Sequence, residues 1–215
     1  MIPARTALAP ASAVSTRDLI LDAAERLFAV RGVDGVAIRD LARELGLTPS
    51  SLYNHFRGKQ ALYEAVLQRG IEPLMRFVGN PEPRELRREH VRATIDRMVP
   101  YFASRPHMAR LLQRAMLEES DAVQALIARW VGSLYREGLG VVGTAAEDAG
   151  WEPGDAQHLA VVIFGAVFGY FANAAALERL GLWDEEARSP AVLDRQRRLL
   201  EETVFRLLGP RRKPR

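Results

Sequence analysis

Apolar residues recur at every third or fourth position along most of this chain, the spacing that puts them on one face of an α-helix. Residues 16–31 carry such a stripe, and Gly32 ends it. The same spacing predicts further helices over 38–45, 49–56, 59–73, 85–104, 106–118, 122–148, 159–177 and 190–208. No stretch alternates apolar and polar residues as a half-buried strand does. The sequence therefore predicts an all-α fold.

Residues 38–56 predict two short helices joined by a sharp corner, which is a helix-turn-helix. Gly46 supplies the left-handed residue that ends the first helix, and Thr48 followed by Pro49 is typical of an N-cap and a first helical residue. Leu52 and Phe56 mark the buried side of the second helix, so its outward side carries Ser50 and Asn54, flanked by Ser51 and Tyr53. Such side chains can reach base edges in the DNA major groove, although a solvated helical hairpin would show the same pattern.

Residues 19–67 resemble the tetracycline-repressor (TetR) family of bacterial transcription regulators. The resemblance rests on Gly32 and Gly35, on Leu-Gly-Leu-Thr at 45–48, and on Leu-Tyr-Asn-His-Phe at 52–56 followed by Lys59. It implies a three-helix N-terminal DNA-binding domain and a second helical domain that binds an effector and dimerises. Two positions depart from the family pattern: Ala37 replaces a capping Thr or Ser that touches phosphate, and Gly58 replaces Ser or Asn.

The candidate DNA contacts fall into two groups. The base-edge candidates, taken from the outward side of the second short helix, are Ser50, Ser51 and Asn54. The phosphate candidates, taken from the family resemblance, are Arg39, Thr48, Tyr53, His55 and Lys59.

Turn-forming residues divide the chain. The segment 79–83 is Gly-Asn-Pro-Glu-Pro, which breaks any helix. We therefore expect a disordered arm over 1–15, the helix-turn-helix domain over 16–60, a connecting helix over 61–79, a ligand-binding and dimerisation domain over 80–208, and a basic tail over 209–215.

Residues 159–177 form a nineteen-residue apolar segment in which only Tyr170 and Asn173 are polar, long enough for a membrane span. The segment is rich in alanine and glycine and has no basic anchor on one side, so we favour a helix buried by its own domain and by a partner subunit. Leucines recur at sevens over 190–208, which offers a seam for another helix. We predict a four-helix homodimer interface, as in the family, that uses Phe164, Gly165, Phe168, Gly169, Leu193, Leu200, Val204 and Leu207.

The middle helices carry many aromatic and methionine side chains, which line apolar pockets but also form ordinary cores. The candidate ligand contacts are Met98, Phe102, His107, Leu112, Met116, Trp130, Tyr135 and Phe168. The four histidines are scattered, there is no cysteine, and no catalytic motif or phosphate loop occurs. We therefore expect no catalytic residues, no metal site and no cofactor.

The overall charge is weak evidence for nucleic-acid binding, because the four basic residues of 211–215 alone carry more positive charge than the net +3 of the chain. The sequence predicts a cytoplasmic homodimer that binds double-stranded DNA at a palindromic operator, most simply a repressor released by an apolar or amphipathic small molecule. A helical-bundle carrier or enzyme, and a membrane-associated helical protein, are the alternatives. Bound metal or turnover would identify the former, and solubility without detergent would exclude the latter.

Overall fold

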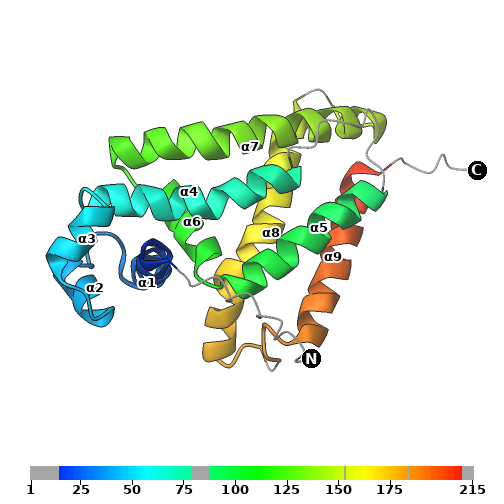
Figure 1. Ribbon diagram of the computed structural model, residues 1–215. Coiled ribbons are helices and arrows are strands. Elements are labelled where there is room, and N and C mark those ends of the chain that lie inside the picture. The colour runs from blue at the N-terminus through cyan, green and yellow to red at the C-terminus, as the bar shows by residue number, and fades with distance from the viewer. Residues whose placement is uncertain (1–14, 79–87, 153, 184, 210–215) are drawn as a thin grey trace, which may run out of the picture.

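The computed structural model describes residues 15–78, 88–152, 154–183 and 185–209, and this part of the chain contains α-helices and no strands (Figure 1). The prediction of an all-α fold is confirmed. The helices are α1 (Thr16–Arg31), α2 (Ile38–Glu44), α3 (Pro49–His55), α4 (Lys59–Val78), α5 (Arg88–Ser104), α6 (Met108–Met116), α7 (Asp121–Asp148), α8 (Asp155–Arg179) and α9 (Pro190–Leu208). The predicted arm over 1–15, except Ser15, and the tail over 210–215 lie outside the described residues.

Helices α1, α2 and α3 form a compact N-terminal unit, shown in blue to cyan in Figure 1. Ser15 caps α1, where its hydroxyl accepts a hydrogen bond from the Asp18 amide at 3.1 Å. The apolar stripes of the three helices meet in one core, because Ile20, Leu41 and Leu52 are each fully buried there. This packing gives two helices of only seven residues a stability that they would lack alone.

Helix α4 leaves this unit and runs alongside α7, making the covalent link between the two parts of the molecule (Figure 1). It continues past Pro73, beyond the periodic pattern over 59–73, and ends at Val78, within the range expected for the connecting helix. A proline inside a helix removes one N–H donor and leaves the carbonyl four residues earlier without its usual partner. That carbonyl belongs to Arg69 and accepts instead from Nη1 of Arg105 at 3.5 Å, so a tertiary contact accompanies the continued helix.

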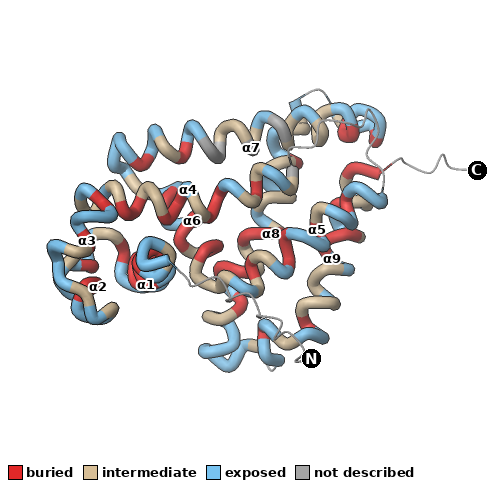
Figure 2. Tube along the Cα trace, viewed as in Figure 1, coloured by how far each residue is buried: buried red, intermediate tan, exposed pale blue. Residues whose placement is uncertain are grey.

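The second part of the molecule is a bundle of α5 to α9. Helix α8 lies in its middle and contacts α6, α7 and α9, while α5 packs along α9 (Figure 1). Figure 2 shows the buried residues gathered on the sides of the helices that face one another. Helix α6 lies between α1 and α8 and so contacts both parts of the molecule.

Among the described residues, α8 is the one helix long and apolar enough to cross a membrane by length and composition, a test that core helices also pass. In the protomer, 33% of its most apolar window is buried, so the protomer covers one side of this helix. Val161 and Val162, near its N-terminal end, are 60% and 53% exposed. Burial of α8 on every side therefore requires a further partner. The predicted burial of this helix by a partner subunit stays a prediction.

Candidate DNA-binding surface and effector domain

The corner between α2 and α3 is held by hydrogen bonds within 42–51. Gly46 has a φ of +66°, in the left-handed region, and the Leu47 amide donates to the Ala42 carbonyl at 2.8 Å. The Thr48 hydroxyl accepts from the Ser51 amide at 3.1 Å, which caps α3 directly before Pro49. The backbone signals seen in the sequence thus form the corner that they predicted.

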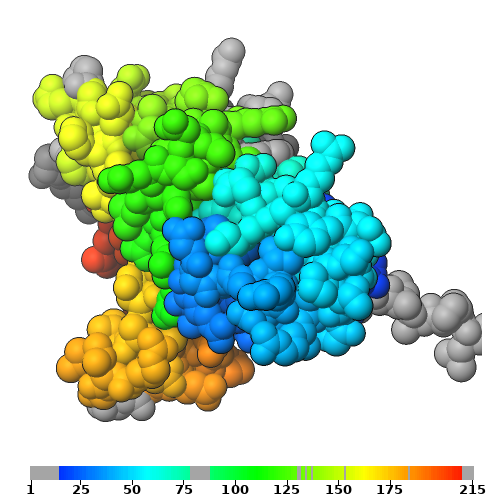
Figure 3. Space-filling view, turned by 90° about the vertical axis from the view of Figure 1, so that its left-hand side faces the viewer, coloured from blue at the N-terminus to red at the C-terminus, as the bar shows by residue number. Residues whose placement is uncertain are grey.

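Helix α3 presents the outward side that its sequence predicted. Leu52 and Phe56 are buried, whereas Ser50, Asn54 and Tyr53 are exposed, the last at 51%. Figure 3 views the molecule from this side, with the N-terminal unit toward the viewer. The remaining DNA-contact candidates also reach the surface of this unit: Arg39, Thr48 and His55 are exposed, and Ser51 and Lys59 are half-buried.

Two charged side chains change the electrostatics near α3. Lys59 Nζ lies 3.8 Å from Oδ1 of the exposed Asp34, which partly balances its charge. The guanidinium of Arg17, at the start of α1, lies over the Phe56 ring at 5.1 Å from its centre. This second contact places a positive charge beside the end of α3, and it could not be predicted from the sequence pattern because the two residues lie far apart in the chain.

Ala37 is the N-cap residue of helix α2 and forms no side-chain cap, as expected from its departure from the family pattern. Asp40 lies in the first turn and forms an ion pair with Arg43. Its carboxylate therefore sits near the positive end of the helix, which it stabilises in place of a cap.

Four of the predicted ligand contacts lie in the interior of the second domain. Phe102 is fully buried, and its ring centre lies 5.1 Å from that of Phe168 and 5.2 Å from that of Phe171. Phe164 stacks on Phe168 at 4.0 Å. These rings, which we call the aromatic cluster, join α5 to α8. Met98 and Leu112 are the other two buried candidates.

The other ligand candidates lie elsewhere or outside the description. Met116 is 42% exposed at the end of α6, so the isolated protomer does not bury it. The Tyr135 hydroxyl donates to the Gln157 carbonyl at 3.2 Å and thereby links α7 to α8. His107 is half-buried, and burial together with Arg110, Arg26 and Arg188 lowers the pKa of its imidazole. The side chain of Trp130 lies outside the described residues.

The predicted dimer contacts divide between the protomer interior and its surface. Phe168, Leu200 and Val204 are buried inside the protomer, so these side chains serve its own core rather than an outward seam. Gly165 is exposed, and Phe164, Gly169, Leu193 and Leu207 are half-buried. Val161 and Val162 on α8 and Leu199 on α9 are exposed apolar side chains that the predicted interface did not include.

Residues 20–66, which span α1, α2, α3 and the start of α4, match the family model described as bacterial regulatory proteins, tetR family. The N-terminal region therefore carries a DNA-binding domain of the TetR family. The helix-turn-helix assignment and the family resemblance are both confirmed.

Two curated TetR-type relatives match this N-terminal region. The HTH-type transcriptional repressor KstR2 of Mycolicibacterium smegmatis is 39% identical over 59 residues, which are 27% of this chain and 29% of that protein. The HTH-type transcriptional regulator SrpR of Pseudomonas putida is 39% identical over 64 residues, or 30% of each chain. The chain thus spans less than a third of the length of these relatives, and the likeness concerns the helix-turn-helix region.

Solved structures extend the likeness to the whole fold. A regulatory protein of the tetR family from Rhodococcus RHA1 has a TM-score of 0.68 at 19% identity, and the match covers 93% of this chain and all of that one. AibR, solved in complex with isovaleryl coenzyme A and operator DNA, has a TM-score of 0.66 at 18% identity, covering 91% and 99%. At these identities the likeness shows that the second domain shares the fold.

Proposed function

We propose that this protein is a DNA-binding transcription regulator of the TetR family that inserts α3 into the major groove of its operator. The observation that supports this proposal most directly is the sidedness of α3, which buries Leu52 and exposes Ser50 and Asn54 on a capped helix. Hydroxyl and amide groups of this kind form hydrogen bonds with base edges. Lys59, Arg39, Tyr53, His55 and Thr48 would contact the phosphates around the groove, where they fix the register of the protein.

A homodimer would supply two such helices to one operator. The exposed apolar side of α8, with Val161, Val162 and Gly165, and Leu199 on α9 give a second copy a surface to bury. Twofold symmetry would then make the operator a near-palindrome with its half-sites on successive major grooves. A soluble dimer of this kind acts in the cytoplasm, where its DNA is.

The effector would be an apolar or amphipathic small molecule that binds among α5, α6 and α8. The aromatic cluster and the adjacent Met98 and Leu112 offer apolar contacts there, and His107 offers a polar one. AibR, which shares the fold, binds isovaleryl coenzyme A, a ligand with an apolar acyl group and a polar carrier. Only a ligand with different affinities for two arrangements of the dimer can release DNA. Repression relieved by such a ligand is the simplest form of this regulation.

The proposal is tested by selecting duplexes from a random DNA pool with the purified protein. We expect a near-palindromic motif from the wild type and its loss in Asn54→Ala, because that substitution removes a base-edge contact. Gln113→Ala removes an exposed amide from α6 and serves as the matched control, which should return the same motif. If the wild type stays a soluble dimer and returns no motif, DNA binding is refuted and the bundle becomes a candidate carrier or enzyme.

A further inference from the structure

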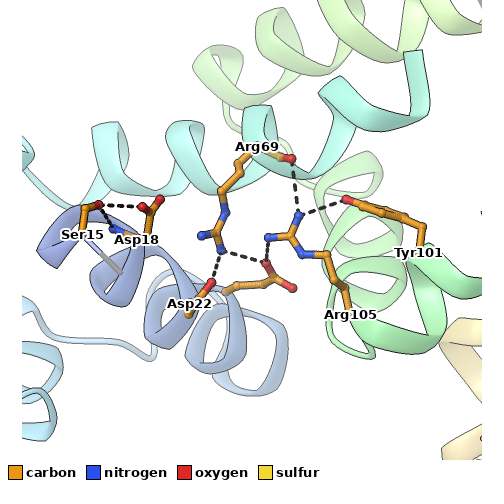
Figure 4. Close-up of polar contacts among 7 residues, drawn as sticks. Ser15, Asp18, Asp22, Arg69, Tyr101 and Arg105 are labelled. Carbon is orange, nitrogen blue, oxygen red and sulfur yellow. Dashed lines mark hydrogen bonds and ion pairs between the residues drawn. The ribbon is translucent and has the colours of Figure 1, made fainter. Parts of the chain in front are cut away.

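A buried carboxylate joins the N-terminal unit to the rest of the molecule. Glu25 on α1 is only 5% exposed, although it lies on the flank of an otherwise apolar stripe. Its Oε2 accepts from Arg105 at 2.8 Å and from Arg69 at 3.2 Å, the two arginines labelled in Figure 4. Arg69 also lies 2.8 Å from Asp22. Helix α1, helix α4 and the turn after α5 therefore meet at one charged cluster, which we call the Glu25 cluster.

Arg105 makes the widest set of contacts in this cluster. Besides Glu25, its guanidinium donates to the Tyr101 hydroxyl at 3.1 Å and to the Arg69 carbonyl at 3.5 Å, the carbonyl that Pro73 leaves without a helical donor. The Tyr101 hydroxyl, whose contact with Arg105 is drawn in Figure 4, in turn donates to the Gly70 carbonyl at 2.6 Å. Arg105 and Tyr101 thus hold two successive carbonyls of α4 while Arg105 also holds α1.

The Tyr101 ring connects this cluster to the interior of the second domain. Its centre lies 5.2 Å from that of Phe102 and 5.8 Å from that of Phe77 on α4. Phe102 belongs to the aromatic cluster, against which the effector would bind. Contacts at hydrogen-bond and ring-packing distance therefore run from the aromatic cluster through Tyr101 and Arg105 to Glu25.

We infer that the Glu25 cluster fixes the orientation of the N-terminal unit relative to the second domain, and that Arg105 is the positioning residue that transmits a change at Tyr101 to α1. Removing one partner of a buried charge pair leaves the other charge uncompensated, so the cluster favours one arrangement of the helices over its alternatives. This inference rests on the proposed function, since orientation of the unit would set the spacing of the two α3 helices on DNA.

The chain contains a matched control for this chemistry. Glu201 on α9 is also 5% exposed and is also held by two arginines, Arg92 at 3.1 Å and Arg88 at 3.8 Å. These arginines belong to α5, so the Glu201 cluster joins two helices within the second domain. Glu201→Gln removes the same charge at the same burial without touching the N-terminal unit.

The first test does not require an operator. Hydrogen–deuterium exchange is measured by mass spectrometry on the whole protein and on Glu25→Gln, Arg105→Gln and Glu201→Gln. We expect amides of 16–31 and 59–78 to exchange roughly three- to tenfold faster in the first two variants. A change of this size is typical when one residue of a coupling network is substituted. Glu201→Gln should leave these segments unchanged. Equal exchange in all proteins, or equal acceleration by Glu201→Gln, would overturn the inference.

The second test uses three duplexes: the operator recovered by selection, and two versions of it in which the half-site spacing is one base pair longer or shorter. The wild type should discriminate among the three duplexes, and Glu25→Gln and Arg105→Gln should lose roughly three- to tenfold of that discrimination. Tyr101→Phe keeps the ring contacts and removes only the hydroxyl, so it remains informative if the charge variants fail to fold. It should lose discrimination in the same direction. Unchanged discrimination in all three variants would contradict the inference, whereas absence of any wild-type motif would refute the proposed function alone.

Discussion

The cap of α3 gives the sharpest test of how the helix-turn-helix corner is stabilised. Helix α3 has seven residues, fewer than an isolated helix needs in water, so its stability depends on Leu52 packing and on the Thr48 cap. Thr48→Val keeps the shape of the side chain and removes the oxygen that accepts from the Ser51 amide at 3.1 Å. Losses of this kind cost about 1 kcal/mol.

This cost has two measurable forms. If the whole protein unfolds cooperatively, the free energy of unfolding falls by about 1 kcal/mol, which lowers the melting temperature by roughly 2–4 °C for a chain of this size. If α3 opens locally, the amides of Ser51 and Leu52 exchange about fivefold faster while the melting temperature stays constant. Thermal unfolding and amide exchange by NMR distinguish the two, and Thr48→Ser should restore the wild-type values.

Ser120 provides the control, because it occupies the N-cap of α7 but its side chain makes no capping hydrogen bond. Ser120→Ala should therefore change the unfolding free energy by less than about 0.5 kcal/mol. The reasoning is refuted if Thr48→Val changes neither the unfolding free energy nor the exchange at Ser51, or if Ser120→Ala costs as much.

Two further predictions concern the second domain. Phe102→Ala removes a fully buried ring with three aromatic neighbours and should lower the free energy of unfolding by roughly 3–5 kcal/mol in urea titrations. The control Val30→Ala, at an exposed position, should lower it by less than about 0.5 kcal/mol. Equal urea midpoints for the two variants would contradict the packing described for Phe102. The lowered pKa of His107 means that the unfolded chain binds its proton more tightly, so unfolding free energy should fall as pH drops through 6.5. His107→Gln should reduce that fall relative to the wild type, and identical pH profiles for the wild type and the variant would show that His107 is not its source.

The sequence predicted those features that depend on residues close together in the chain. Gly46, Thr48 and Pro49 encode the corner through their own backbone preferences, and the spacing of Leu52 and Phe56 encodes which side of α3 is exposed. These signals are local, so one sequence suffices to interpret them.

Features that depend on distant residues were not predictable in this way. Glu25 is buried because Arg69 and Arg105 compensate its charge, and these partners lie 44 and 80 residues away along the chain. Burial nevertheless raises the pKa of Glu25 despite the opposing effect of the two arginines. Its flanking position on α1 gave no signal that distinguished it from a solvated glutamate.

The leucine repeat of α9 illustrates a second limit. The repeat correctly indicated that α9 packs against another helix. That helix is α5 of the same protomer, because Leu200 and Val204 are buried within the protomer. A periodic stripe shows that a helix is covered on one side, and it does not say by what. The dimer interface therefore stays a prediction, for which the exposed Val161, Val162 and Leu199 now define the surface to mutate.

The central claim is that α3 recognises DNA sequence while the surrounding residues bind its backbone. It is tested most directly by measuring affinities for the selected operator and for a scrambled duplex over a range of salt concentrations. Asn54→Ala should lower discrimination between the two duplexes by roughly 1–3 kcal/mol. Lys59→Ala should weaken binding to both duplexes alike and reduce the slope of log affinity against log salt by about 1. A wild type that binds both duplexes equally, or two variants that lose specific and nonspecific binding in equal measure, would contradict the account.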